Sequence, residues 1–381
     1  MKQKVSDYIA EYIAQWGIRD VFTVTGGGAM HMNDAFGHHK MLHCTYQHHE
    51  QACAMAAEAY ARLGNKMAAV CVTTGPGATN AITGVLGAWM DSIPMLVFSG
   101  QARYATTVSA SGLPLRSMGV QECNIVPVVK SLTKYAHMIV HPENIRYHLE
   151  KALYLAVNGR PGPVWLDIPL DVQGAVIETD DLKAYDPEEN PEQQPREIKD
   201  ETVEQILDKL QESKRPVLSP GNGVRLAGAH EDFYQLAELL GVPVVTGMSS
   251  VDAIESDHPL FVGRSGGTGT RPGNFALQNS DVLLSLGNRQ GFAQTGFRYQ
   301  DWARESYTIL NDIDENELKK PKPACQSACM RRCRRADPKA DKGCKKAWSF
   351  QGKPLIAREM TWRNQCLLWK QKLSGCCVRS L

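Results

Sequence analysis

Short apolar runs that alternate with amphipathic segments of helical period constrain the fold of this chain more than any other feature. In the first half of the chain the apolar runs occupy 21–24, 42–46, 68–73, 95–99 and 163–168. The run at 68–73 is apolar at nearly every position, which is typical of a strand covered on both faces. Strands that alternate with helices through short loops favour a parallel sheet with helices on both sides.

The predicted helices between these runs have clear periodic faces and stop signals. The first helix repeats Val5, Ile9, Tyr12, Ile13 and Trp16 at helical spacing, and Gly17 ends it. The next long helix ends at Gly64 and is expected to bury a face made by Ala52, Met55, Ala56, Ala59 and Leu63. Further helices are predicted over 78–90 and 143–157.

The same alternation returns in the second half of the chain. Helices are expected over 203–210 and 233–240, and strands over 216–219, 242–246, 281–286 and 307–312. The turn Gly221-Asn222-Gly223 lacks the third glycine of the dinucleotide fingerprint. We therefore predict an α/β chain of two three-layer αβα domains with parallel sheets, the second of them Rossmann-like.

Composition sets the expected domain boundaries. We predict a first domain at 1–175, an acidic, proline-broken linker at 176–200, a central domain at 201–320 and a tail at 321–381. The tail holds 15 of the 42 Lys and Arg residues but 3 of the 41 Asp and Glu residues, so its net charge is +12 and that of the remainder is −11. The tail also holds seven of the eleven cysteines and has neither helical nor strand periodicity. We interpret it as foreign sequence, disordered or read out of frame.

Two other interpretations of the tail are weaker. Cys325, Cys329, Cys333 and Cys344 would be the ligands of a metal module, but no CxxC pair supports one. Nucleic-acid binding is not favoured, because no recognisable fold presents the basic residues. No apolar run approaches the roughly 20 residues of a membrane span. Asp7 and Glu11 argue against a signal peptide, and the cysteine-poor remainder indicates a cytoplasmic protein.

The turns after the predicted strands point to a site. Glycines 26–28, glycines 75 and 77, and Glu50 all follow strands, and ligands of parallel sheets bind beyond the carboxyl ends of the strands. Glu50 is able to exchange a proton with a nitrogen base if it is desolvated. Alternatively it is an ordinary acid at a helix N-terminus. His48 and His49 alternate in direction on a strand, so a shared metal ion is not expected.

Two further features, a loop arginine and a group of cysteines, are left open or have ordinary explanations. Arg160 stands in a stiff turn, where it either contacts an anion or is solvated. Cys44, Cys53 and Cys71 lie in apolar surroundings and are expected to be core thiols.

Four segments, in this order, resemble thiamine-diphosphate-dependent enzymes of the acetolactate synthase type. They read HHEQACAMAAEAYARLGNK, VTTGPGATNAITGVLGAWMDSIPMLVFSGQ, VQE and VNGRPGPVWLDIPLDV, and the resemblance covers residues 1–320. It implies a pyrimidine-binding domain followed by a central Rossmann-like domain. It also implies decarboxylation of a 2-oxo acid such as pyruvate and transfer of the resulting unit to a second 2-oxo acid.

The resemblance also implies residue roles. Glu50 corresponds to the family glutamate that hydrogen-bonds the aminopyrimidine ring of the cofactor and shifts its tautomer. Gly27, Pro76 and Asn80 correspond to residues around that ring. Gln121 matches the glutamine of the family F-Q-E signature, in which Val120 here replaces the aromatic residue. Lys130 resembles a lysine near the substrate channel.

The same resemblance implies a flavin site and shows that a metal-binding motif of the family is absent from the sequence. Where the family binds FAD, the matching residues are Arg160, Gly269, Thr270, Asn274, Asp312 and Asp314. The Gly-Asp-Gly motif that holds Mg²⁺ and the diphosphate occurs nowhere in the chain, so no metal ligand is predicted. We expect a chain truncated before the pyrophosphate-binding domain, inactive alone, that pairs as a homodimer or larger assembly through the first domain.

Two alternatives remain. One is another thiamine-diphosphate-dependent decarboxylase or carboligase on this scaffold, which Val120 keeps open. The other is a catalytically silent nucleotide-binding or assembly module.

Overall fold

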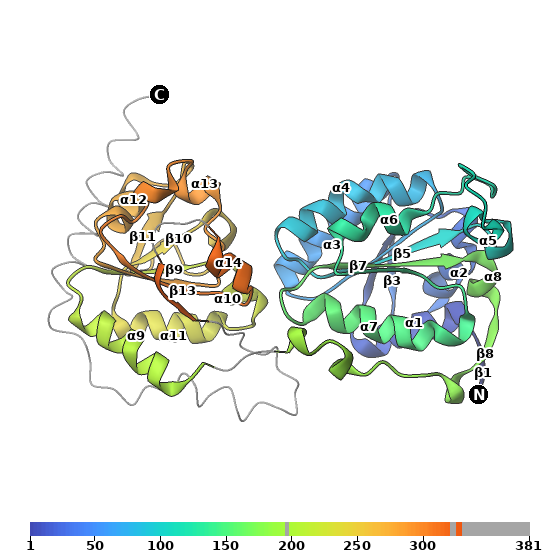
Figure 1. The fold of residues 1–381 in the computed structure, drawn as a ribbon, viewed down its shortest axis with the longest axis horizontal. Coiled ribbons are helices and arrows are strands. Elements are labelled where there is room, and N and C mark those ends of the chain that lie inside the picture. Colours follow the sequence, from blue (N-terminus) through green and yellow to red (C-terminus); the bar gives the residue numbers. More distant parts are fainter. Residues whose placement is uncertain (195–197, 321–324, 330–381) are drawn as a thin grey trace. The chain divides into compact units, whose positions relative to one another are not determined.

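Two parallel sheets organise the part of the chain that the structure describes. The computed structural model describes residues 1–194, 198–320 and 325–329. It divides the chain into a first unit, Met1–Gln194, and a second unit, Pro195–Leu381 (Figure 1). Both units have the predicted α/β class, with helices on both faces of a parallel sheet.

The first sheet has six parallel strands in the order β3-β2-β4-β5-β7-β6. Its strands are β2 (Asp20–Thr23), β3 (His43–Tyr46), β4 (Ala69–Val72), β5 (Met95–Gln101), β6 (Tyr135–Met138) and β7 (Pro163–Pro169). Strands β4, β5 and β7 are buried at every position, as the continuous apolar runs predict.

Helices cover both faces of this sheet, with α3, α4 and α6 on one side and α1 and α7 on the other (Figure 1). The helices of the first unit are α1 (Val5–Trp16), α2 (Met30–His38), α3 (Glu50–Gly64), α4 (Pro76–Met90), α5 (Val108–Ser111), α6 (Ile125–Val129), α7 (Ile145–Val157) and α8 (Leu170–Gly174). Gly17 ends α1 in the left-handed conformation, with φ at 111°, as its position predicts.

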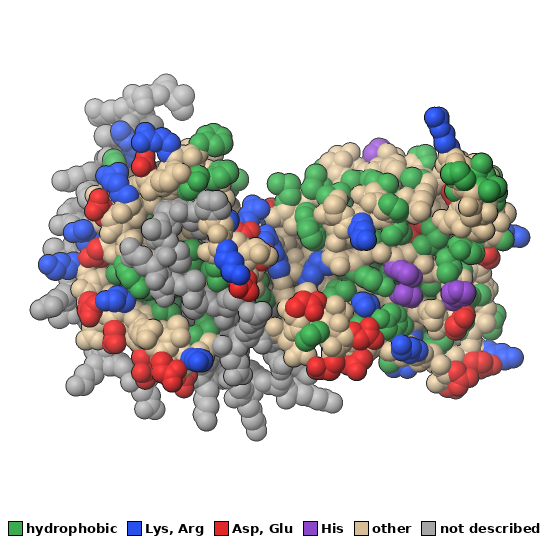
Figure 2. Space-filling view, in the orientation of Figure 1, with side chains coloured by type: hydrophobic (Ala, Val, Ile, Leu, Met, Phe, Trp, Pro, Cys, Tyr) green, Lys and Arg blue, Asp and Glu red, His purple; other side chains and the backbone are tan. Residues whose placement is uncertain are grey.

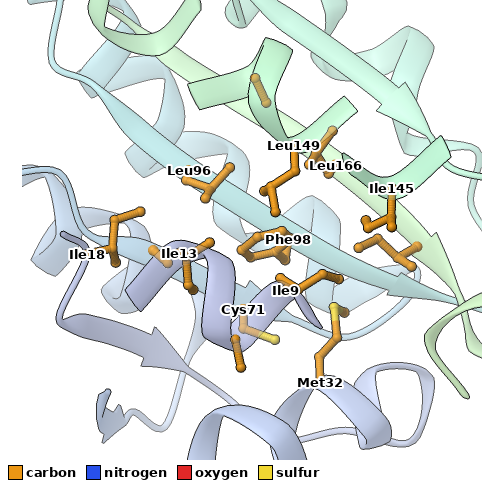
Figure 3. Packing of buried hydrophobic residues seen from close by; sticks show 14 of the residues in the cluster. Ile9, Ile13, Ile18, Met32, Cys71, Leu96, Phe98, Ile145, Leu149 and Leu166 are labelled. Atoms are coloured by element: carbon orange, nitrogen blue, oxygen red, sulfur yellow. The ribbon is translucent and has the colours of Figure 1, made fainter. Parts of the chain in front are cut away.

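A large core lies between the sheet and the face that carries α1 and α7. Ile9 and Ile13 of α1 and Leu149 of α7 converge on Leu96 and Phe98 of β5 (Figure 3). All five side chains are fully buried. Each such side chain contributes on the order of 2 kcal/mol to folding, so this layer fixes the sheet that positions the site.

The prediction of which residues of α3 are buried was wrong. Cys53, Ala54, Ala57 and Ala61 are buried, whereas Met55 is 44% exposed and Leu63 is 85% exposed. Close approach to α4 explains the difference, because a Cβ on Gly84 would lie 2.6 Å from the Cβ of Ala54. In an alanine-rich helix the small residues make the closest contacts, so the larger apolar residues do not mark the buried face.

The segment expected to be a linker holds regular structure. Strand β8 (Val176–Glu178) pairs antiparallel with β1 (Lys2–Lys4), and the side chains of Leu182 and Tyr185 are buried. Two 3-10 turns begin at the prolines, over Pro187–Glu189 and Pro191–Gln193. Acidic side chains gather along the lower edge of the first unit, where this segment runs (Figures 1 and 2). Apolar anchors therefore fasten an acidic, proline-rich stretch onto the first unit.

The second sheet also has six parallel strands, in the order β11-β10-β9-β12-β13-β14. Its strands are β9 (Pro216–Pro220), β10 (Val244–Thr246), β11 (Phe261–Arg264), β12 (Val282–Leu286), β13 (Tyr307–Asn311) and β14 (Cys325–Cys329). In chain order this is the 3-2-1-4-5-6 arrangement of doubly wound nucleotide-binding folds, in agreement with the Rossmann-like prediction.

Strand β14 corrects the expectation that no element follows residue 320. Its backbone pairs with β13 in parallel register and completes the sixth position of the sheet. The sequence CQSAC lacks the apolar run that marks the other strands, so the pattern gave no signal for it. Cys333 and Cys344 lie outside the described residues.

The helices described in the second unit are α9 (Asp200–Glu212), α10 (Asn222–Leu226), α11 (His230–Leu240), α12 (Arg271–Gln278), α13 (Phe292–Thr295) and α14 (Glu315–Lys319). Of these, α9 and α11 were predicted and the others were not. Phe233, Leu236, Ala237 and Leu240 of α11 are buried, and Gly241 ends the helix with φ at 65°. Within the described residues, no helix is both long and apolar enough to cross a membrane.

Candidate functional site

The predicted site residues of the first unit gather at the carboxyl edge of its sheet. Glycines 26–28 follow β2, Glu50 follows β3 and begins α3, and Gly75 and Pro76 follow β4 and begin α4. Strands β2 and β4 are neighbours from which the chain proceeds in opposite directions across the sheet. Such a switch point opens a crevice for ligands in parallel α/β sheets.

Glu50 is the first residue of α3 and does not stand on a strand. His49 caps the helix, its Nδ1 accepting from the backbone N–H of Gln51 at 3.1 Å. Asn80 of α4 donates from Nδ2 to Glu50 Oε2 at 3.0 Å. The carboxylate is partly buried, and within the described residues no donor binds its other oxygen, Oε1. One oxygen is therefore held in place while the other remains available to a ligand.

Glycines bring the surrounding loops close to this carboxylate. A Cβ on Gly77 would lie 3.3 Å from Glu50 Oε1 and 2.7 Å from Cγ2 of Thr73. A Cβ on Gly26 would lie 2.4 Å from the Cβ of Thr73, whose hydroxyl accepts from the backbone N–H of Gly28 at 3.0 Å. Gly27 has open space where its Cβ would be. A side chain therefore fits at Gly27 but not at Gly26 or beside Glu50 at Gly77.

Gln121 lies beside the turn that carries Pro76. Gly75 has φ at 58°, and a Cβ there would lie 2.0 Å from the backbone oxygen of Gln121, so the position needs glycine. Gln121 itself has φ at 54° and an exposed side chain, and its neighbour Val120 is 83% exposed. Lys130 is exposed at the end of α6, and no contact within the described residues joins it to Glu50.

Glu122 holds the loop that leads to Gln121. Its carboxylate accepts from the backbone N–H groups of Val108, Met118 and Gly119 at 2.7, 3.0 and 2.9 Å. Burial raises the pKa of Glu122, but the three backbone donors outweigh that effect and hold the pKa below its usual range. The loop is therefore folded around a charged carboxylate directly beside the candidate site.

Sequence reasoning missed a buried polar group behind these loops. Asp167 of β7 is fully buried and accepts from Ser99 Oγ at 2.6 Å and from Gln101 Nε2 at 3.2 Å. Burial raises the pKa of Asp167 to about 7, although both hydrogen bonds act to lower it. A lone carboxylate inside a predicted strand with two covered faces was the available signal.

The thiols of the first unit behave as core residues. Cys53 and Cys71 are buried, and burial raises the pKa of each to about 12, with the nearby charge of Glu50 adding to the effect on Cys53. Cys44 is partly buried on β3, and burial raises its pKa as well. The prediction of core thiols is confirmed for Cys53 and Cys71.

Arg160 lies away from Glu50. It stands between α7 and β7, at the amino edge of the sheet, and donates from Nε to Ser92 Oγ at 2.8 Å. Ser92 precedes β5, so this bond ties together two loops on the edge opposite to the candidate site.

The predicted flavin residues of the second unit form a closed loop between β11 and α12. Thr270 caps α12, its hydroxyl accepting from the backbone N–H groups of Arg264 and Gly273 at 3.1 and 3.3 Å. Asn274 binds the backbone of Gly266 through both ends of its amide, at 2.9 and 3.1 Å. A Cβ on Gly269 would lie 2.5 Å from the backbone oxygen of Arg264. These side chains shape the loop itself.

Asp312 and Asp314 follow β13 and build the start of α14. Asp312 Oδ1 accepts from the backbone N–H of Asp314 at 3.0 Å, and Asp314 Oδ1 accepts from that of Asn316 at 2.9 Å.

At the switch point between β9 and β12, the backbone N–H of Gly223 donates to the backbone oxygen of Gly287 at 3.0 Å. The two glycine turns there pack against each other.

The described residues hold no cluster of three or more His, Cys, Asp or Glu side chains that suits a metal ion. His48 and His49 are both exposed, and His49 acts as the cap of α3. The side chains of Cys325 and Cys329 lie outside the described part of the chain, as do Cys333 and Cys344.

Comparison with known proteins gives a consistent result over both units. Residues 3–128 match the family model of the thiamine pyrophosphate enzyme N-terminal TPP binding domain, and residues 203–330 match that of the central domain. The second match includes β14.

Individual relatives agree with these matches. Acetolactate synthase 2, chloroplastic, of Zea mays is 34% identical over 334 residues, which are 86% of this chain and 50% of the relative. Acetolactate synthase, chloroplastic, of Arabidopsis thaliana is 31% identical over 97% of this chain and 53% of its own length. The acetolactate synthase large subunit of Corynebacterium glutamicum is 34% identical over 79% of this chain and 46% of its own length. The chain spans about half the length of the curated relatives it matches.

Proposed function

The chain belongs to the thiamine pyrophosphate enzymes, and from that premise we propose that it takes part in carboligation of 2-oxo acids of the acetolactate synthase type. In the proposed reaction pyruvate is decarboxylated and its two-carbon unit is transferred to a second 2-oxo acid. The observation that carries this proposal is the Asn80–Glu50 hydrogen bond at the carboxyl edge of the first sheet. We assign to these residues the glutamate half of the cofactor site.

The residues around Glu50 suit an aminopyrimidine ring. Asn80 holds Oε2, which leaves Oε1 to bind a ring nitrogen beside the positive end of α3. Backbone at Gly27, whose Cβ position is open, and the ring of Pro76 would line the two sides of the bound pyrimidine. Thiamine diphosphate, when bound, supplies the carbon nucleophile that accepts the 2-oxo acid and allows loss of CO₂.

Gln121 and Lys130 are the proposed substrate-facing residues. The contact between Gly75 and Gln121 supports a role for Gln121 at the reacting end of the crevice. Lys130 is exposed, as a residue at a channel entrance would be. Val120 is exposed, and it is smaller than the aromatic side chain that the family has at this position. The acceptor substrate is therefore either a 2-oxo acid or an aldehyde.

The other half of the cofactor would be held elsewhere. No Gly-Asp-Gly occurs in these 381 residues, so we propose that Mg²⁺ and the diphosphate bind to a complementary half-site, and that the 381 residues alone are inactive. Exposed apolar side chains on α3 and α4, among them Met55, Leu63 and Trp89, support pairing of at least two copies through the first unit. We propose a cytoplasmic location.

FAD remains a proposed structural cofactor of the second unit. Thr270 and Asn274 would act by shaping the loop at 265–270, since their polar atoms already bind its backbone. Gly267, with open space at its Cβ position, would leave that backbone accessible. A yellow purified protein with a flavin spectrum supports this assignment. A colourless protein that takes up no added FAD excludes it and favours another decarboxylase or a silent assembly module.

Binding of thiamine tests the pyrimidine site directly. Thiamine lacks the diphosphate, so its affinity reports the glutamate half of the site alone. Binding is followed by proton NMR, because the signal of the 2-methyl group of thiamine broadens when thiamine binds. We expect Glu50→Gln to weaken binding about tenfold, because a carboxylate acceptor is lost. Glu143→Gln is the matched control, since Glu143 is exposed beside the far edge strand β6. Equal affinity of the Glu50 and Glu143 variants would refute the assignment.

A further inference from the structure

A single buried amide joins the two loops of the candidate site. The side chain of Gln101 lies at the end of β5 and is 1% exposed. Its Nε2 donates to the backbone oxygen of Cys123 at 2.8 Å, two residues beyond Gln121. Its Oε1 accepts from the hydroxyl of Thr74 at 2.6 Å, next to Gly75. Gln101 therefore bonds directly to the segments on both sides of the Gly75–Gln121 contact.

The amide of Gln101 is fully used. Beyond the bonds to Cys123 and Thr74, Nε2 donates to Asp167 Oδ2 at 3.2 Å and Oε1 accepts from the backbone N–H of Ala102 at 3.0 Å. Both N–H donors and both acceptor positions of the amide thus have partners. A rotation of the amide by 180° would exchange donors for acceptors and break three of these bonds, because only the hydroxyl of Thr74 is able to accept as well as donate.

Asp167 determines which way the amide faces. The indole N–H of Trp165 donates to Ser99 Oγ at 2.8 Å, so the hydroxyl proton of Ser99 is directed to Asp167 Oδ1 at 2.6 Å. When it is ionised, the carboxylate of Asp167 accepts from Ser99 on one oxygen and from Gln101 on the other. Because the ionised carboxylate of Asp167 can only accept hydrogen bonds, the NH₂ end of Gln101 must face β7.

We propose that Asp167 is a positioning residue of the candidate site. By fixing the orientation of the Gln101 amide, it sets the separation between the Thr74–Pro76 turn and the Gln121–Cys123 segment. The inference rests on the proposed function for its claim that these two segments line the cofactor pocket. The carboxylate acts from inside the sheet and touches neither cofactor nor substrate.

Asp167→Asn is the direct test, because asparagine keeps the shape but accepts only one of the two bonds. Its NH₂ group either opposes the NH₂ group of Gln101 or donates to Ser99 Oγ, and in the second case the hydroxyl proton of Ser99 loses its acceptor. At pH 8, where the wild-type carboxylate is ionised, we expect hydrogen exchange of the full chain to become about fivefold faster in peptides covering 74–79 and 119–125, the effect of losing one hydrogen bond. Exchange in β4 and β5 should stay unchanged. Unaltered exchange at both loops, or equal acceleration throughout the unit, would overturn the proposal.

A second pair of variants keeps the proposal testable if Asp167→Asn fails to fold. Thr74→Val removes the hydroxyl at the outer end of the network, and Thr74→Ser keeps it. We expect about fivefold faster exchange at 74–79 in the valine variant and near-normal exchange in the serine variant. Equal exchange in the two variants would show that the hydroxyl does not hold the turn.

Thiamine affinity separates this inference from the proposed function. If the wild-type chain binds no thiamine, the proposed function fails while the exchange measurements still report the network. If it binds, the proposal expects several-fold weaker thiamine binding in Asp167→Asn, with the Glu50–Asn80 pair intact. Loosened loops with unchanged thiamine affinity would refute the positioning role.

Discussion

Asn80 of α4 donates a hydrogen bond of 3.0 Å to the carboxylate of Glu50, which begins α3. The bond joins two helix N-termini that follow different strands of one sheet. It holds one carboxylate oxygen, Oε2, and leaves the other, Oε1, beside Gly77. Of the two explanations of Glu50 that the sequence left open, the structure confirms an acid at a helix N-terminus, and the role of Glu50 in a cofactor site stays a proposal.

Replacement of Asn80 should reveal how much this bond stabilises the first unit. Asn80→Ala removes the donor and is expected to lower the free energy of unfolding by about 1 kcal/mol. Asn80→Asp should cost more, because it places a second carboxylate beside Glu50. The change in the free energy of unfolding of each variant is measured by urea unfolding, with hydrogen exchange in β4 as the readout. If the aspartate variant is as stable as the wild type, the two side chains do not meet.

The close contact between α3 and α4 predicts a strong effect at a small residue. Gly84→Ala would place a Cβ 2.6 Å from that of Ala54 and 2.8 Å from the backbone nitrogen of Met55, so the helices must move apart. We expect a loss of about 1–3 kcal/mol in the free energy of unfolding. Gly27→Ala is the control, because its Cβ would meet open space and its cost should stay within about 0.5 kcal/mol. Similar losses from both variants would contradict the packing.

Stability should depend on pH through Asp167. Burial raises the pKa of Asp167 to about 7 from an ordinary value of 3.8. The folded chain therefore holds a proton that the unfolded chain has released, and this contribution to stability is lost as the pH rises from 4 through 7. The stability of the wild type relative to Asp167→Asn should be higher at pH 5 than at pH 8, by on the order of a few kcal/mol. A pH-independent difference would contradict the burial of an ionisable group there.

Sequence patterns predicted the central strands of both sheets because burial on both faces leaves a continuous apolar run, but they missed the edge strands β6 and β11. They also located α11 to within a few residues, since its apolar stripe and Gly241 agree. The buried face of α3 was missed because close packing selects small side chains such as Ala54, which leave no stripe to recognise. Strand β14 was missed because pairing with β13 requires only backbone groups.

The positions of the candidate site residues in the fold were predicted in part for similar reasons. Turns after strands located Glu50 and Pro76, because parallel strands end at one edge of the sheet. Gln101 and Asp167 were missed because the role of a polar residue in a buried strand depends on its hydrogen-bond partners. Those partners lie far apart in the chain, so the sequence pattern does not reveal them. The burial of Leu182 and Tyr185 in the segment at 176–194 was missed because the many acidic residues and prolines around them are typical of a linker.

Complementation in mixed assemblies tests the central claim most directly. The chain is co-expressed with a full-length acetolactate synthase in which glutamine replaces the glutamate that matches Glu50, so that each partner lacks what the other supplies. We predict measurable acetolactate formation from pyruvate in the purified mixed assembly. The same assembly made with the Glu50→Gln chain should give none, as should the chain alone. Equal activity with and without the Glu50 carboxylate, in assemblies of confirmed composition, would contradict the account.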